Sequence, residues 1–249
     1  MPTERCAIAV MAKAPRAGKV KTRLVPPLTA EEARALSGCF LRDVTANIAV
    51  AGCVVPIDGY IAYAPAGAAA LFGPVIEPGT RFVLADGAIA PRDGVTGFGC
   101  SLLHAAEGLC AQGYGGVCLL NSDSPTLPTR LLVEAAQALA APGDRVVLGP
   151  ADDGGYYLIG VKAPHDHLFR DIAWSTGTVA AQTRARAGER GLAVVELAPW
   201  YDVDDVAALR TLLDELDGRA PTWIDGSAAP ETARWLAQNQ LRERLAAAA

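Results

Sequence analysis

Short apolar runs alternate along the chain with longer segments in which apolar residues recur every three or four positions. The runs are typical of strands buried on both faces of a sheet, and the periodic segments are typical of amphipathic helices. Strands are predicted over residues 6–12, 54–55, 61–63, 117–120, 145–150, 156–161 and 193–197. Helices are predicted over residues 30–48, 102–113, 131–139, 176–190, 206–216 and 230–249. This alternation indicates one α/β domain, a three-layer α/β/α sandwich around a mostly parallel sheet.

Turn and capping residues refine these elements. Residues 29–32 (Thr-Ala-Glu-Glu) form a capping box that opens the first helix. Residues 58–59 (Asp-Gly) are expected to form a turn, and Ser175 or Thr176 to cap the helix that ends near residue 190. The short turn at residues 154–155 (Gly-Gly) requires the strands beside it to pair antiparallel, so one strand of the sheet is reversed.

The whole chain of 249 residues is interpreted as one domain, with its core at about residues 6–215. No composition break or linker divides it. The amphipathic segment 230–249 is predicted to be a C-terminal helical clasp or an oligomer contact, so a homodimer is left open.

Composition and charge exclude several classes of protein. Half of the residues are hydrophobic, which excludes general disorder, and the formal charge of −5 provides no field to gather nucleic acid or an anionic membrane. The six cysteines lack metal-ligand spacing and are interpreted as core residues of a reduced compartment. No segment has the roughly 20 apolar residues of a membrane span, and none reads as a secretory signal. We therefore expect a cytoplasmic protein.

A basic loop follows the first predicted strand. Residues 13–24 (KAPRAGKVKTRL) contain five Lys or Arg residues together with Pro15 and Gly18. Glycine lets backbone amides approach phosphate oxygens, and lysine and arginine supply charge and hydrogen-bond donors. The spacing is not that of a Walker A loop. The loop is interpreted as a polyphosphate-binding segment, the alternative being a solvated run of charge.

Carboxylates follow three of the predicted strands. Asp123 comes directly after residues 117–120, where open α/β sheets bind their ligands, although it could instead form an Asx-turn. Asp153 lies in the glycine turn, where it could contact a ligand. Asp202 and Asp204 are two residues apart on an extended segment and therefore share a face, while Asp205 is placed to cap the following helix. Two close carboxylates repel unless a cation lies between them.

These groups together favour chemistry at phosphate. Basic residues for phosphates and separated carboxylates for a divalent metal are the components of phosphoryl or nucleotidyl transfer. Trp174 could stack on a ligand ring or serve as a buried anchor. The three histidines form neither a Ser/His/Asp nor a zinc pattern, so no competing catalytic arrangement is present.

Five ordered stretches carry a family resemblance: AKAPRAGKVKTRL, LLNSDSPTLP, LGPADDGGYYLIG, WSTGTV and YDVDD. Over residues 6–215 the chain resembles the GT-A superfamily of nucleotide-diphospho-sugar transferases. Within it, the chain resembles the bacterial family labelled as the arsenosugar-biosynthesis type of glycosyltransferase. The resemblance implies a Rossmann-like GT-A fold with a mostly parallel mixed sheet and one antiparallel strand. The basic loop and the final Asp-Val-Asp are also similar to 2-phospholactate guanylyltransferase and, more distantly, to the molybdenum-cofactor guanylyltransferases.

The resemblance implies a role for individual residues. It implies Mg²⁺, or Mn²⁺, at Asp123 and Asp204, and catalytic roles for Lys21, Arg23 and Asp123. The residues assigned to nucleotide binding are Lys13, Ala14, Pro15, Gly18, Lys21, Arg23 and Ser122. The residues assigned to the acceptor are Asp153, Gly154, Gly155, Trp174 and Ser175. The family's Gly-Glu-Arg-like stretch reads Gly-Cys-Ser at residues 99–101, which departs from the pattern and indicates a different substrate contact.

The hypothesis for function is a Mg²⁺-dependent nucleotidyltransferase. It would move a nucleoside monophosphate from a nucleoside triphosphate to a small phosphate- or phosphonate-bearing acceptor, with release of pyrophosphate. Asp123 is followed by Ser124 and Pro125 rather than by the second carboxylate of a DxD pair, which favours nucleotidyl over glycosyl transfer. A glycosyltransferase that uses a nucleotide-diphospho-sugar and a non-catalytic nucleotide-binding regulator are the alternatives. The expected partners are a nucleotide and a small acceptor, not nucleic acid or a membrane.

Overall fold

A seven-stranded sheet forms the centre of the computed structural model, which describes residues 3–220 and 226–247. Its strand order is β3-β2-β1-β4-β6-β5-β7. The strands are β1 (Thr3–Lys13), β2 (Ile57–Ala64), β3 (Arg81–Leu84), β4 (Tyr114–Leu120), β5 (Arg145–Pro150), β6 (Tyr156–Val161) and β7 (Ala193–Glu196). The α-helices are α1 (Ala30–Gly52), α2 (Phe98–Ala111), α3 (Thr129–Ala140), α4 (Val179–Glu189), α5 (Val206–Leu216), α6 (Pro230–Gln238) and α7 (Leu241–Ala247). The short 3-10 helices are η1 (Thr22–Leu24), η2 (Ala69–Leu71), η3 (Gly73–Val75) and η4 (Asp166–Phe169).

One strand of this sheet is reversed. β6 pairs antiparallel with both β4 and β5, and the other neighbouring strands pair parallel. The glycine turn between β5 and β6 therefore acts as predicted. Because β5 and β7 run in the same direction as β4, the segments that follow all three strands emerge at one edge of the sheet.

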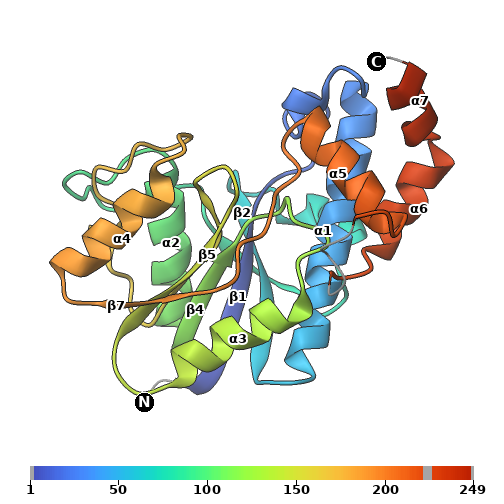
Figure 1. Cartoon of the computed structure of the whole chain (residues 1–249). Helices are drawn as coiled ribbons and strands as arrows, with labels where there is room; N and C mark the ends of the chain where they lie inside the picture. Colours follow the sequence, from blue (N-terminus) through green and yellow to red (C-terminus); the bar gives the residue numbers. More distant parts are fainter. Residues whose placement is uncertain (1–2, 221–225, 248–249) are drawn as a thin grey trace.

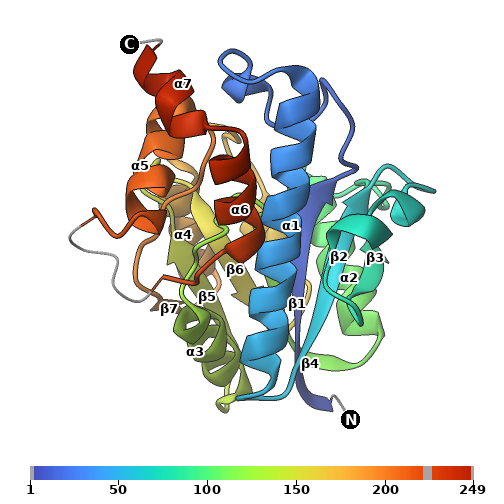
Figure 2. The same ribbon diagram turned by 90° about the vertical axis from the view of Figure 1, so that its right-hand side faces the viewer.

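Helices cover both faces of the sheet (Figures 1 and 2). Along β1, Ile8 and Val10 pack in the cluster that contains α1, α3 and the C-terminal helices. The alternate residues Ala7 and Ala9 pack in the cluster that contains α2 and α4. Side chains of a strand point alternately to opposite faces, so one strand contributes to both cores. The structure confirms the predicted three-layer α/β/α sandwich.

The predicted start of the first helix is also confirmed. The Thr29 side chain accepts a hydrogen bond from the backbone amide of Glu32, and the Glu32 carboxylate accepts one from the amide of Thr29. This reciprocal pair satisfies two amides that would otherwise lack partners at the helix start. Asp205 caps α5 in a similar way by accepting from the amide of Ala208.

The prediction of two short strands around a turn at residues 58–59 is wrong. Residues 57–64 form the single strand β2, and residues 54–55 lie outside it. A side chain on Gly59 would approach the Ile48 side chain of α1 to 3.1 Å. Gly59 therefore allows the helix to pack closely on the strand, and the Asp-Gly pair is not a turn here.

The predicted cap of the fourth helix is wrong as well. α4 begins at Val179, its N-cap residue is Thr178, and none of the described side chains caps it. The backbone amide of Ala180 instead donates to the carbonyl of Gly154. A tertiary contact to the β5–β6 turn thus replaces the local cap expected from Ser175 or Thr176.

The predicted C-terminal helix is two helices, α6 and α7, because the chain takes a left-handed conformation at Gln240. α6 lies beside α1 (Figure 2), and buried residues of both C-terminal helices belong to the same core cluster as α1. The buried carboxylate of Asp43 in α1 accepts from the first amides of α6, and Arg244 of α7 pairs with Glu32. None of the helices that the structure describes is long and apolar enough to span a membrane.

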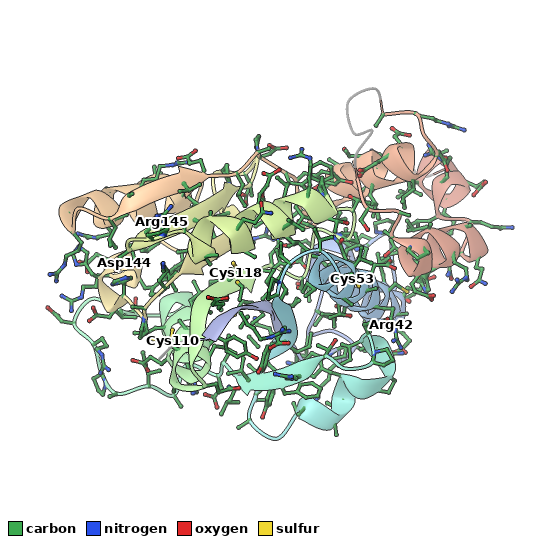
Figure 3. The ribbon with its side chains drawn as sticks, turned by 90° about the horizontal axis from the view of Figure 1, so that it is seen from below. Arg42, Cys53, Cys110, Cys118, Asp144 and Arg145 are labelled. Carbon is green, nitrogen blue, oxygen red and sulfur yellow. The ribbon has the colours of Figure 1, made fainter. Side chains whose placement is uncertain are left out.

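The cysteines are all free thiols and are spread over several elements (Figure 3). Cys6 and Cys118 are buried, and their sulfur atoms lie 3.9 Å apart in the core. Cys39, Cys100 and Cys110 are partly buried. Cys53 at the end of α1 is exposed, so the interpretation of the cysteines as core residues is wrong for this one.

Candidate active site

A cleft of about 460 Å³ opens at the carboxyl ends of β1, β2 and β4. β2 and β4 flank β1 on opposite sides, so the strand order reverses there, which is where open α/β sheets bind ligands. The cleft is lined by Met11, Ala12, Lys13, Lys19, Val20, Lys21, Thr22, Arg23, Ser37, Leu41, Ala62, Ala64, Ala85, Phe98, Ser101, Asn121, Ser122, Asp123 and Asp204. Its volume and mixed lining suit a small polar ligand with one apolar part.

The basic loop forms one wall of this cleft. Lys13 and Lys19 are exposed, and within residues 3–220 and 226–247 neither pairs with a carboxylate. Arg23 is largely exposed and lies 3.5 Å from Asp204. These cations are therefore available to an anionic ligand. Ala14, Pro15 and Gly18, which were also assigned to the nucleotide, lie in the loop but do not line the cleft.

Lys21 connects three segments that are distant in the sequence. Its ammonium lies 2.8 Å from Asp123 Oδ1, donates to the carbonyl oxygen of Val203 at 2.7 Å, and lies 3.4 Å from Asp204 Oδ1. The ammonium also lies over the ring of Phe40, and the side chain is only 5% exposed. The predicted carboxylates after β4 and β7 thus meet, and a lysine from the loop after β1 joins them.

Lys21 affects the two carboxylates differently. Burial alone would raise the pKa of Asp123, but the charge and hydrogen bond of Lys21 outweigh it and hold that pKa below its usual value. Asp204 is farther from the ammonium. Burial, and next the charge of Asp123, raise the pKa of Asp204 above its usual value.

Asp202 lies near this pair but does not line the cleft. Burial, followed by the charges of Asp204, Asp153 and Asp123, raises its pKa to about 6. Three carboxylates around Asp202 produce a concentration of negative charge at this edge of the sheet. A bound cation would relieve this repulsion.

The segment after β4 is ordered by its own hydrogen bonds. Ser122 donates to Asp123 Oδ1 at 2.7 Å, and the buried Ser124 hydroxyl donates to the carbonyl of Tyr201. Asn121 lines the cleft and donates to Ser124. Asp123 is therefore presented to the cleft on a fixed support and does not form the Asx-turn considered above as its alternative.

The residues assigned to the acceptor lie outside the lining of the cleft. Asp153 Oδ1 accepts from the amide of Gly155, and a side chain on Gly154 would overlap the carbonyl of Gly177. The ring of Trp174 packs edge-on against that of Phe98, with centroids 5.6 Å apart, and Phe98 does line the cleft. Ser175 is exposed in a left-handed conformation. Their role in acceptor binding stays a prediction.

Several residues that line the cleft were not predicted from the sequence. Phe98 and Ser101 come from the first turn of α2, beside and within the stretch that departs from the family pattern at residues 99–101. Phe98 is 47% exposed, which is unusual for a large apolar side chain. Ser37 and Leu41 come from α1, where their spacing is that of any buried helix face. Only the departure near residue 100 was a signal in the sequence.

Asp123 and Asp204 suit a divalent metal that is shared with a substrate. Within residues 3–220 and 226–247, no group of three or more His, Cys, Asp or Glu side chains could hold a metal ion. Mg²⁺, however, commonly takes one or two carboxylates and completes its shell with phosphate oxygens and water. Because one ammonium reaches oxygens of both carboxylates, a single cation can be held between them.

Comparisons with solved structures agree with this fold. A protein from Desulfovibrio desulfuricans G20, provisionally assigned as a nucleotide-diphospho-sugar transferase, is 28% identical, with a TM-score of 0.77 over 96% of each chain. CMP:2-keto-3-deoxy-manno-octonic acid synthetase, solved with CTP, is 11% identical, with a TM-score of 0.52 over 87% of this chain and 100% of that chain. The 4-diphosphocytidyl-2C-methyl-D-erythritol synthase from Anaerococcus prevotii DSM 20548 is 11% identical, with a TM-score of 0.51 over 86% of this chain and 97% of that chain. The last two likenesses show the fold alone.

Among curated proteins, no match to the chain is found. A family model described as "Uncharacterized protein conserved in bacteria (DUF2064)" matches residues 48–176, which is more than half of the chain. The chain belongs to this DUF2064 family.

Proposed function

We propose that the chain is a metal-dependent nucleotidyltransferase that acts on a small acceptor bearing a phosphate or phosphonate. One observation carries the proposal: the exposed cations Lys13 and Lys19 share a cleft, at the reversal of strand order, with the converging carboxylates Asp123 and Asp204. Cations suit the phosphates of the donor, and the carboxylates suit the metal that accompanies them.

The reaction places definite demands on the residues of the cleft. An oxygen of the acceptor phosphate attacks the α-phosphorus of the nucleoside triphosphate, and the bond from that phosphorus to the bridging oxygen breaks. The electron pair of that bond leaves with pyrophosphate. Lys13, Lys19 and Arg23 stabilise the growing negative charge on pyrophosphate by charge and hydrogen bonding. Residues of the basic loop therefore serve both binding and the transition state.

Asp123 and Asp204 are the residues that would hold Mg²⁺ or Mn²⁺. When bound, such a metal neutralises phosphate charge and orients the triphosphate. Ser122 fixes the carboxylate of Asp123 by donating to it. The carboxylates come from two different loops, so their separation depends on the packing of the β7–α5 segment against β4. The backbone bond from the Val203 amide to the Asp123 carbonyl, 2.9 Å long, holds these segments together.

The structure around residue 125 supports nucleotidyl over glycosyl transfer. Pro125 occupies the position where a DxD pair would have its second carboxylate, and Ser124 beside it is buried. The second carboxylate comes instead from Asp204. These two carboxylates, from the segments after β4 and β7, would hold a metal at the edge of the cleft, next to the cations that suit a triphosphate.

A glycosyltransferase is the second candidate. The observation that favours it is the 28% identity, over 96% of each chain, to the protein provisionally assigned as a nucleotide-diphospho-sugar transferase. Both reactions use a nucleotide with a pyrophosphate group, so the basic wall of the cleft fits either donor. A non-catalytic nucleotide-binding regulator would use the same wall without turnover.

The test compares ligands and then turnover. Thermal unfolding is measured with each nucleoside triphosphate and each common nucleotide sugar in the presence of Mg²⁺, since a ligand of the folded state raises the midpoint. The proposal expects a triphosphate to give the largest rise, and pyrophosphate release once the acceptor is supplied. A larger rise with a nucleotide sugar than with every triphosphate would refute nucleotidyl transfer. Binding without turnover across phosphate and phosphonate acceptors would favour the regulator.

Two variants identify the residues responsible. Asp123→Asn and Asp204→Asn should each abolish turnover, whereas Asp152→Asn, in the β5–β6 turn outside the lining of the cleft, should retain it. Equal activity in the Asp123 variant and the unaltered protein would exclude the assigned metal role.

A further inference from the structure

The ammonium of Lys21 lies between the two carboxylates that we assign to the metal. It lies within 3.4 Å of an oxygen of Asp123 and an oxygen of Asp204. Its third partner is the carbonyl of Val203 at 2.7 Å, and the ring of Phe40 closes the remaining side. The side chain is 5% exposed, so solvent screens this charge poorly.

A divalent ion and this ammonium cannot share the two carboxylates at low cost. Mg²⁺ binds oxygen at about 2.0–2.1 Å. A metal bound to Asp123 Oδ1 would therefore lie less than about 5 Å from the Lys21 nitrogen, which is 2.8 Å from the same oxygen. Two positive charges at that separation in a partly buried site repel strongly.

We propose that Lys21 and the divalent metal compete for Asp123 and Asp204, so that Lys21 keeps the metal out until a polyphosphate takes over its ammonium. This inference rests on the proposed function in one respect, the identity of that polyphosphate as the donor nucleotide. The competition itself concerns only residues of the chain and a cation.

The backbone at Lys21 is consistent with a residue that changes partners. Lys21 has φ 48° and ψ 37°, a left-handed conformation that costs an L-residue about 1–2 kcal/mol. In this conformation the carbonyl of Lys21, at the start of η1, accepts from the Leu24 amide, while the ammonium contacts the two carboxylates. Its neighbours Thr22 and Lys19 are exposed, and Gly18 in the same loop has a positive φ. Release of the ammonium would therefore free a strained loop residue that already borders the cleft.

The competition determines the order of binding. Metal alone meets two carboxylates that Lys21 already contacts and whose charge it partly offsets, so it binds weakly. A nucleotide offers phosphate oxygens to the lysine and oxygen ligands to the metal, so metal and nucleotide bind together. Lys21 is a positioning residue in this scheme: it selects the metal–nucleotide complex over the free ion.

The test measures metal binding without any nucleotide. Free Mn²⁺ is titrated with the protein and followed by its electron paramagnetic resonance signal. Lys21→Met removes the charge but keeps most of the apolar stem, and we expect it to bind Mn²⁺ at least tenfold more tightly than the unaltered protein. Lys19→Met is the matched control, because Lys19 lines the same cleft and pairs with no carboxylate in the part of the chain that the structure describes. Its Mn²⁺ affinity should change less than threefold.

Further variants keep the result decisive. Adding Asp123→Asn to Lys21→Met should abolish the gain. Lys21→Gln, whose amide can still donate a hydrogen bond, should show the same direction of change and serves if Lys21→Met does not fold by circular dichroism. A folded Lys21 variant whose Mn²⁺ affinity equals that of the unaltered protein would overturn the proposal. Because no nucleotide is present, failure here is distinct from failure of triphosphate turnover.

Discussion

The pair Lys21–Asp123 predicts a difference in stability between two substitutions that should be equally inactive. Asp123→Asn removes the charge nearest to Lys21: Asp123 Oδ1 lies 2.8 Å from the lysine ammonium, and the lysine side chain is 5% exposed. Asp204→Asn removes a charge at 3.4 Å on a side chain that is 43% exposed. Both changes keep the shape of the side chain, so their comparison isolates the effect of charge on the stability of the fold.

The magnitude follows from burial. Two charges 2.8 Å apart attract by about 6 kcal/mol at an effective dielectric constant of ~20, before the cost of desolvation. Removing one partner of a buried pair costs roughly 3–5 kcal/mol. In the Asp123→Asn variant, the new side-chain amide oxygen and the Val203 carbonyl can still accept from Lys21, so we expect the free energy of unfolding to fall by about 2–4 kcal/mol. Asp204 is itself 43% exposed and lies farther from the ammonium, so Asp204→Asn should cost less than about 1 kcal/mol.

Urea unfolding at neutral pH, followed by circular dichroism, measures both values. The pKa of Asp123 is lowered by the charge of Lys21 against the opposing effect of burial. A lowered carboxyl pKa stabilises the fold above the pKa of the unfolded chain, about 3.9, and this contribution disappears as the pH falls through the lower folded value. The deficit of Asp123→Asn should therefore shrink below about pH 4. Equal deficits for the two variants at neutral pH would refute the reasoning.

Three further predictions concern other parts of the chain. Lys13→Met should weaken triphosphate binding about tenfold and reduce the dependence of that binding on salt, without changing the free energy of unfolding. Isothermal titration calorimetry at several salt concentrations measures the affinity and its salt dependence, and an unchanged affinity would exclude Lys13 from the binding site. Glu32, whose pKa the hydrogen bond from Arg244 lowers to about 2, stabilises the fold above its unfolded pKa of 4.5. Glu32→Gln should therefore cost about 1–2 kcal/mol at pH 7 in urea unfolding, after allowance for the exposure of Arg244, and the cost should vanish between pH 4.5 and 2. Gly154 has a positive φ, and a Cβ added there would overlap the carbonyl of Gly177, so Gly154→Ala should lower the melting temperature by several degrees. An unchanged melting temperature would mean that the β5–β6 turn and the loop at Gly177 separate freely.

The fold was largely predictable because its signals are local. The apolar run at residues 117–120 and the glycine turn at residues 154–155 lie in single short windows, and their neighbours along the chain determine their structure. The turn predicted at residues 58–59 was wrong for the opposite reason, because a distant contact determines the structure there. Gly59 serves a helix that packs on its strand, and the sequence around an Asp-Gly pair contains no information about Ile48.

The part of the candidate site that the order and direction of the strands determine was predictable from the sequence. Asp123 and Asp204 both follow strands, and parallel strands end at one edge, so both carboxylates were expected at that edge. Their close approach was not expected, because β7 lies three positions from β4 in the sheet and the segment after β7 returns to the Asp123 carbonyl through the Val203 amide. The contact of Lys21 with both was not expected either, since it depends on one left-handed residue in a loop without sequence periodicity. Phe98, Ala62 and Ala64 line the apolar part of the cleft, but a lining residue of this kind has the same apolar character as a core residue.

The placement of the basic loop also gives the molecule a charge asymmetry. Residues 13–23 carry five positive charges and no negative ones, so the rest of a chain with net charge −5 carries −10. Positive charge is therefore concentrated at the end of the sheet where this loop forms one wall of the cleft, while the remainder of the chain is on balance negative. A small phosphorylated metabolite, once within a Debye length (about 8 Å at physiological ionic strength), is drawn to that end. A long polyanion extends beyond it and meets the negative remainder, so the same distribution of charge attracts small anions and repels long ones.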